Sequence, residues 1–129
     1  MGVAHLSEAW LDRWRELAAD LPEQPGASGT IAVTVLKAPG GDVTYHLTFE
    51  DGRLVAAGLG DGDAPVALTQ THADALAVLD GTLDVVVGVM RGKVKYAGDT
   101  GVYLALQPVL QSDAHRAVLA ALAAETDRP

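Results

Sequence analysis

The chain of 129 residues contains no cysteine. This absence excludes a disulfide scaffold, a thiol nucleophile and a thiolate metal site, and it is compatible with a reducing compartment. Aromatic residues make up only 5% of the chain, although hydrophobic residues make up 49%. The core must therefore be built mainly from Val, Leu and Ala, a composition that is suited to lining an apolar pocket.

Basic residues are also scarce, since nine Lys and Arg stand against 17 Asp and Glu and give a formal net charge of −8. Nucleic acids and anionic membranes both bind preferentially to surfaces rich in Lys and Arg, so we expect neither as a partner. The longest apolar stretches, around Val85–Met90 and Ala117–Ala124, are well short of the ~20 residues that a stable membrane span needs. Glu8, Asp12 and Arg13 stand where a secretory signal needs an apolar core, which predicts a cytoplasmic protein.

A length of 129 residues is typical of one domain, and no linker long enough to divide 1–129 is present. Helical spacing of apolar residues predicts a helix over Ser7–Leu21, and residues 1–29 are interpreted as this helix and a linker. Trp10 and Trp14 lie on its apolar stripe. They are interpreted as core anchors rather than a membrane-insertion surface, because interfacial helices usually carry a basic polar side.

From Thr30 the apolar period changes to two, which is typical of strands. Three antiparallel strands are predicted in succession, with turns at Ala38–Gly41 and Asp51–Gly52. A short strand at Pro65–Thr69 and a last strand at Lys93–Tyr96 complete a sheet of about five strands.

Helical spacing returns near residue 71 and predicts helices over Thr71–Leu79, Val102–Leu110 and Ser112–Ala124. Pro108 is expected to kink or end the second of these helices. Val85–Met90 is ambiguous from local signals alone, because β-branched residues favour a strand whereas Thr82 and Asp84 suggest a helix start. The polar residues 125–129 are expected to fray, so 112–129 is interpreted as a helix and a frayed tail. The predicted class is α+β, with helices gathered on one face of the sheet.

Two blocks of sequence resemble the sterol carrier protein type-2 family: residues 68–84 (LTQTHADALAVLDGTLD) and residues 90–99 (MRGKVKYAGD). In that family a strand leads into a helix that ends at Gly, a second short helix follows, and a Gly-Lys strand closes with Gly-Asp or Gly-Asn. The order and spacing of these motifs extend the resemblance over most of residues 30–111.

The resemblance implies a five-stranded, mostly antiparallel sheet with helices covering one face, and an apolar tunnel for sterols, fatty acids or acyl-CoA esters. It also implies that Val85–Met90 is helical. On this basis we expect non-catalytic binding and transfer of an apolar, lipid-like molecule, without a cofactor or a metal. The residues expected to line the tunnel are Leu47, Phe49, Val85, Val89, Met90, Val102, Leu106, Val109 and Leu110. The same apolar stripes are also the ordinary pattern of packed core.

Two other classes of function stay open. Domains of this family are found fused to larger enzymes, so an accessory module or a homodimer with a filled core is one alternative. A small hydrolase or isomerase is the other, and it would need His46 or His72 to open into the apolar pocket that the resemblance implies. Ser112, Asp113 and His115 are triad residues by type, but their position at a helix start favours helix capping over catalysis.

Overall fold

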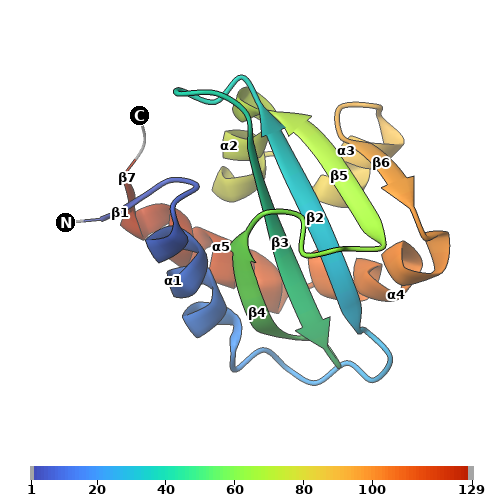
Figure 1. Ribbon diagram of the computed structural model, residues 1–129. Coiled ribbons are helices and arrows are strands. Elements are labelled where there is room, and N and C mark those ends of the chain that lie inside the picture. Colours follow the sequence, from blue (N-terminus) through green and yellow to red (C-terminus); the bar gives the residue numbers. More distant parts are fainter. Residues whose placement is uncertain (1, 128–129) are drawn as a thin grey trace.

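The computed structural model describes residues 2–127. Its elements, in chain order, are β1 (Val3–Ala4), α1 (Glu8–Ala18), β2 (Gly29–Leu36), β3 (Val43–Glu50), β4 (Arg53–Leu59), β5 (Val66–Thr71), α2 (His72–Asp80), α3 (Val85–Met90), β6 (Lys95–Gly98), α4 (Thr100–Leu110), α5 (Asp113–Glu125) and β7 (Thr126–Asp127). A five-stranded sheet forms one layer, and the helices lie along one of its faces (Figure 1). The predicted α+β class is confirmed.

The sheet has the order β4-β3-β2-β5-β6. Its central pair, β2 and β5, is parallel, whereas the other three neighbouring pairs are antiparallel. Ile31 and Val33 are buried beneath the helices, whereas Thr30 and Thr34 point to the opposite face and share hydrogen bonds with threonines of β3, each at 2.9 Å. The two-residue period of the sequence therefore separates an apolar, helix-covered face from a polar one.

Three helices begin at the hydroxyl residues that the sequence suggested. Ser7, Thr71 and Ser112 each accept a hydrogen bond from the backbone N–H three residues further on, at 3.2, 3.2 and 3.1 Å. Each hydroxyl thereby satisfies one of the N–H groups that a helix start leaves without a partner. At the other end of α2, Gly81 adopts the left-handed conformation (φ 80°) that stops the helix.

The first helix is shorter than predicted. It ends at Ala18 rather than at Leu21. The N–H of Leu21 bonds to the carbonyl of Ala18 at 3.3 Å, which closes a turn instead of continuing the helix. Pro22 explains this, because the ring of a proline disfavours the helical conformation in the residue before it.

Val85–Met90 is the helix α3, as the resemblance implies and against the propensity of its valines. The Oδ1 atom of Asp84 accepts hydrogen bonds from the N–H groups of Val86 and Val87 at 2.9 and 3.2 Å. Gly88 lets this short helix approach the following segment, since a Cβ there would lie 2.9 Å from a methyl group of Val94. The capping carboxylate and this close approach therefore outweigh the β-branched side chains.

One strand boundary after α3 is wrong, and the prediction for Pro108 is decided only in part. The last strand of the five-stranded sheet is Lys95–Gly98 rather than Lys93–Tyr96, because the N–H groups of Lys93 and Val94 donate to the carbonyl of Gly88 and close α3. Pro108 does not end α4, which begins at Thr100 rather than Val102 and ends at Leu110 as predicted; a kink at Pro108 stays a prediction. Proline has no backbone N–H, so α4 lacks one hydrogen bond in its last turn.

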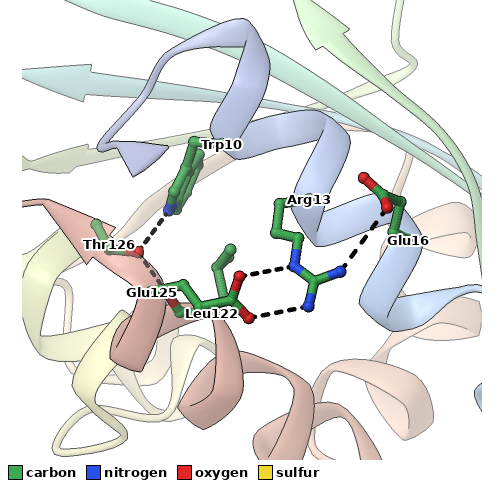
Figure 2. A network of polar contacts seen from close by, with 6 residues as sticks. All are labelled: Trp10, Arg13, Glu16, Leu122, Glu125 and Thr126. Atoms are coloured by element: carbon green, nitrogen blue, oxygen red, sulfur yellow. Dashed lines mark hydrogen bonds and ion pairs between the residues drawn. The ribbon is translucent and has the colours of Figure 1, made fainter. Parts of the chain in front are cut away.

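The two ends of the described part of the chain, residues 2–127, meet. Thr126 and Asp127 pair with Val3 and Ala4 as a short parallel ladder, so fraying is the wrong prediction for residues 125–127; residues 128–129 lie outside the described residues. Figure 2 shows how α1 is fixed to α5. The indole N–H of Trp10 donates to the hydroxyl of Thr126 at 3.0 Å, and Arg13 forms two hydrogen bonds, of 2.8 and 3.0 Å, with the carboxylate of Glu125.

The tryptophans of α1 are core anchors, as predicted. Trp10 and Trp14 retain 3% and 6% of their exposure, and their rings pack against each other and against Tyr45. In the described part of the chain, no helix has the length and apolar character that crossing a membrane requires.

Candidate functional site

A cavity of about 300 Å³ lies between the sheet and the helices. Strands β2, β3 and β5 form its floor through Ile31, Val33, Tyr45, Leu47, Leu68 and Gln70. Its roof comes from α1, α2, the α2–α3 turn and α5, and includes Trp14, Leu79, Leu83, His115 and Leu119. The wall is mostly apolar, and the volume lies at the lower end of the range for small-molecule sites, roughly 300–1,000 Å³.

The alternation of side chains along the strands explains which residues form the floor of the cavity. Leu68 and Gln70 are two residues apart on β5 and therefore share the face beneath the helices, as do Ile31 and Val33 on β2. Most of the side chains that form the floor are aliphatic. Tyr45 is the aromatic exception, and the ring of Trp14 covers it at a centroid distance of 6.0 Å.

Three polar side chains of the wall carry buried atoms that have no hydrogen-bond partner among the described residues. These atoms are Nε1 of Trp14, Oε1 of Gln70 and Nδ1 of His115. The rings of Trp14 and His115 lie 6.1 Å apart. Burial lowers the pKa of His115 to about 4, so its imidazole is neutral at pH 7.

The cavity opens where its wall becomes polar and exposed, between the α2–α3 turn and α5. Asp80, Thr82 and Arg116 are exposed wall residues there, and Arg116 bonds to Oδ2 of Asp84 at 2.7 Å. Burial alone would raise the pKa of Asp84. Hydrogen bonds from Arg116 and from backbone N–H groups outweigh it and lower that pKa, so the mouth carries an ionised carboxylate.

A model of the SCP-2 sterol transfer family matches residues 9–111. The chain belongs to the SCP-2 sterol transfer family. The matched residues include the whole cavity floor and the α2–α3 turn, whereas α5, with His115 and Leu119, follows the matched span. Membership supports the binding and transfer of sterols or other lipids in general.

Solved structures of other SCP-2 proteins share this fold. A crystal structure of sterol carrier protein 2 has a TM-score of 0.68 at 18% identity, over 92% of this chain and 97% of that chain. A conserved hypothetical protein from Thermus thermophilus, described as possibly a sterol carrier protein, has a TM-score of 0.66 at 22% identity, over 95% and 94%. Palmitated sterol carrier protein 2 like 2 from Aedes aegypti has a TM-score of 0.60 at 20% identity, over 87% and 96%. A comparison with curated proteins gives no significant match.

Three of the residues expected to line the SCP-2 tunnel lie in the cavity wall. Leu47 belongs to the floor, Val85 to the start of α3, and Leu110 to the end of α4. Their contact with a ligand stays a prediction, as does the through-going tunnel that the resemblance implies.

The other six expected residues lie outside this wall. Fully buried core positions are occupied by Phe49, Leu106 and Val109, and partly buried positions against the core by Val89 and Val102. Met90, the last residue of α3, is 76% exposed. A helical stripe predicts which residues face inward, but it does not predict whether they face packed atoms or a cavity.

The roof residues Trp14 and His115, and Gln70 in the floor, were not among the expected site residues. Strand alternation could have placed Gln70 inside, because it follows the buried Leu68 by two residues. Helical spacing could have done the same for His115, which precedes Leu119 by four residues on α5. Their polar character hid these positions from a search for apolar stripes.

The histidines of the hydrolase alternative lie elsewhere. His46 is on the open face of the sheet, where its Nδ1 lies 3.1 Å from the carbonyl of Gly60. His72 lines a separate hollow of about 450 Å³ near the N-terminal end of the described chain. Ser112 caps α5 and donates its hydroxyl to the carbonyl of Val109 at 2.8 Å. Neither histidine therefore meets a nucleophile in the cavity between sheet and helices.

Proposed function

We propose that this SCP-2 protein binds an apolar, lipid-like molecule in the cavity between sheet and helices and transfers it without catalysis. The observation that carries the proposal is the mostly apolar cavity of about 300 Å³ in a chain of this family. The palmitated Aedes aegypti structure supports a lipid occupant for the same fold. A cytoplasmic location stays a prediction.

The energetics suit a carrier. Burying a dozen methylene groups gains on the order of 10 kcal/mol, at ~0.8 kcal/mol each. Association costs ~4–15 kcal/mol, so the net affinity is modest. A protein that transfers its cargo must also release it, and modest affinity permits release.

The alternative of an accessory module requires a filled core, and the cavity favours the carrier over it. A Leu119→Trp substitution separates the two, because Leu119 lies in the roof. Inside a cavity the larger side chain occupies free volume and costs little stability, whereas in a filled core it overpacks by ~1–3 kcal/mol. Leu104→Trp is the matched control, since Leu104 is 54% exposed on α4.

The test combines native mass spectrometry of the purified protein with calorimetric titrations of dodecanol and dodecanoate. We expect saturable binding of at least one lipid by the wild type and by Leu104→Trp, and its loss in a folded Leu119→Trp protein. Absence of bound lipid and of saturable binding in the wild type would reject the carrier function.

A further inference from the structure

The two tryptophans of α1 differ in the hydrogen bonding of their indole N–H groups. Trp10 and Trp14 are one helical turn apart on α1, and both rings are buried. Trp10 donates its indole N–H to Thr126, as Figure 2 shows. Trp14 lines the cavity, and its N–H has no partner among residues 2–127. The indole N–H that lies away from the cavity is therefore bonded, whereas the one in the cavity wall is not.

Gln70 and His115 repeat this pattern from two other elements. Gln70 of β5 is 5% exposed and His115 of α5 is 2% exposed, and each has a buried polar atom that no described residue bonds. Folded proteins pair the great majority of such atoms. Such atoms also occur elsewhere among residues 2–127, on His72 and Tyr103, whereas three belong to the wall of this one cavity, from its floor and its roof. This concentration indicates a place that a polar group of a ligand completes.

The charges of the wall decide what kind of polar group fits. Asp84 contributes a negative charge, and Arg116 contributes a positive charge that is already bonded to Asp84. His115 is neutral at pH 7 because its burial lowers its pKa to about 4. An anionic head group inside the cavity would therefore be desolvated without a cation to pair with it, which is strongly unfavourable.

Hydrogen-bonding capacity narrows the choice further. The indole of Trp14 only donates, whereas the neutral imidazole of His115 and the amide of Gln70 can each donate or accept. A hydroxyl group both accepts from an indole N–H and donates to an imidazole nitrogen or an amide oxygen. A hydrocarbon or a carbonyl group alone cannot do both.

We infer that Trp14, Gln70 and His115 form a hydrogen-bonding subsite for a neutral hydroxyl group, which makes this cavity selective for long-chain or polycyclic alcohols over carboxylates. This inference rests on the proposed function and specifies the chemical class of its ligand. The aliphatic floor holds the hydrocarbon, and the subsite sets the position of the hydroxyl.

The test compares four probes on the full chain at pH 7: dodecanol, dodecanoate, dodecane and cholesterol. We expect at least one of the two alcohols to bind about tenfold or more tightly than dodecanoate and dodecane. The comparison of dodecanol with cholesterol distinguishes a linear from a polycyclic source of the hydroxyl. Equal or tighter binding of dodecanoate overturns the inference, as does equal binding of dodecane.

Variants then assign the effect to the subsite. Gln70→Met and His115→Leu keep approximate volume but remove hydrogen bonding, so each is expected to weaken alcohol binding by about two- to tenfold and leave dodecane binding unchanged. Tyr103→Phe is the matched control, because its hydroxyl is also buried without a partner in the described chain but lies outside the cavity wall. Tyr103→Phe should change neither alcohol binding nor dodecane binding. If Gln70→Met and His115→Leu weaken alcohol and dodecane binding in parallel, or weaken neither, the inference of a hydroxyl subsite is overturned.

The outcomes also separate this inference from the proposed function. If the wild type binds none of the four probes, both fail. If it binds dodecane or dodecanoate as tightly as the alcohols, the carrier function stands and the hydroxyl subsite fails. The wild-type comparison needs no substitution, so it decides the matter even if a variant does not fold.

Discussion

His115 shows how burial sets the chemistry of one side chain. Its imidazole lies among the rings of Trp14 and Phe49, at centroid distances of 6.1 and 6.2 Å, and retains 2% of its exposure. An imidazolium ion in this place would lose its hydration without gaining a counter-charge. The cavity wall therefore keeps the neutral form, and protonation of His115 is coupled to unfolding.

Acid should destabilise the protein through His115. Its pKa is about 4 when folded and 6.5 ordinarily, so the unfolded chain binds more protons between these values and stability falls as pH falls through this window. The expected loss in the free energy of unfolding is about 3 kcal/mol, at 1.36 kcal/mol for each pH unit. Urea unfolding of the wild type and of His115→Leu from pH 7 to pH 4 measures it.

The variant isolates this contribution from that of the carboxylates. Hydrogen bonds from Arg13 lower the pKa of Glu125, and the pKa of Asp84 is lowered too, so acid weakens the folded state through these groups in both proteins. Only the difference between the two pH profiles belongs to His115. Parallel profiles would show that the buried imidazole is not held neutral.

At the scale of elements, Asp84 joins three parts of the cavity mouth. Its Oδ1 caps α3, its Oδ2 bonds to Arg116 of α5, and its backbone ends the α2–α3 turn. The helix cap and the ion pair contribute differently to stability because their exposure to solvent differs. The side chain of Asp84 is 12% exposed, whereas that of Arg116 is 56% exposed. Solvent and salt screen the ion pair more than the cap.

Removing the cap should cost more than removing the ion pair. Asp84→Ala is expected to lower the free energy of unfolding by about 1–2 kcal/mol, the usual cost of losing an N-cap. Arg116→Ala removes only the screened pair and should cost less than about 1 kcal/mol. Asp84→Asn is the matched control, because its amide oxygen can still cap α3. Urea unfolding ranks the three variants, and an Arg116→Ala cost equal to that of Asp84→Ala would contradict this division.

Most elements follow from sequence, and the exceptions have physical reasons. Alternation placed the strands and Ser, Thr and Gly marked the helix ends, because these signals are local. The choice between strand and helix at Val85–Met90 was not settled by residue propensity, because the cap from Asp84 and the close approach of Gly88 to the following segment outweigh the β-branched side chains. The residues of the cavity wall were harder still to predict from the sequence. Leu106 and Leu110 share one helical stripe, yet Leu106 faces packed core and Leu110 faces the cavity.

At the scale of the whole molecule, the two ends of the chain jointly cover the sheet. Trp14 comes from α1 and Leu119 from α5, and the Arg13–Glu125 contacts link these helices across 112 residues of sequence. Figure 1 shows both helices on the same face of the sheet. The roof of the cavity therefore exists only in the folded chain, and a ligand that fills the cavity must stabilise folding as a whole.

A bound ligand should raise the unfolding temperature. A ligand that binds only the folded state at ten times its dissociation constant adds about 1.4 kcal/mol to the free energy of unfolding. For a domain of this size that corresponds to roughly 5 °C. Differential scanning calorimetry with increasing dodecanol measures the shift, which should grow with the logarithm of ligand concentration. Leu119→Trp, with its cavity filled, should show no shift while Leu104→Trp shifts like the wild type. An equal shift in all three proteins would place the lipid on the surface rather than beneath the roof.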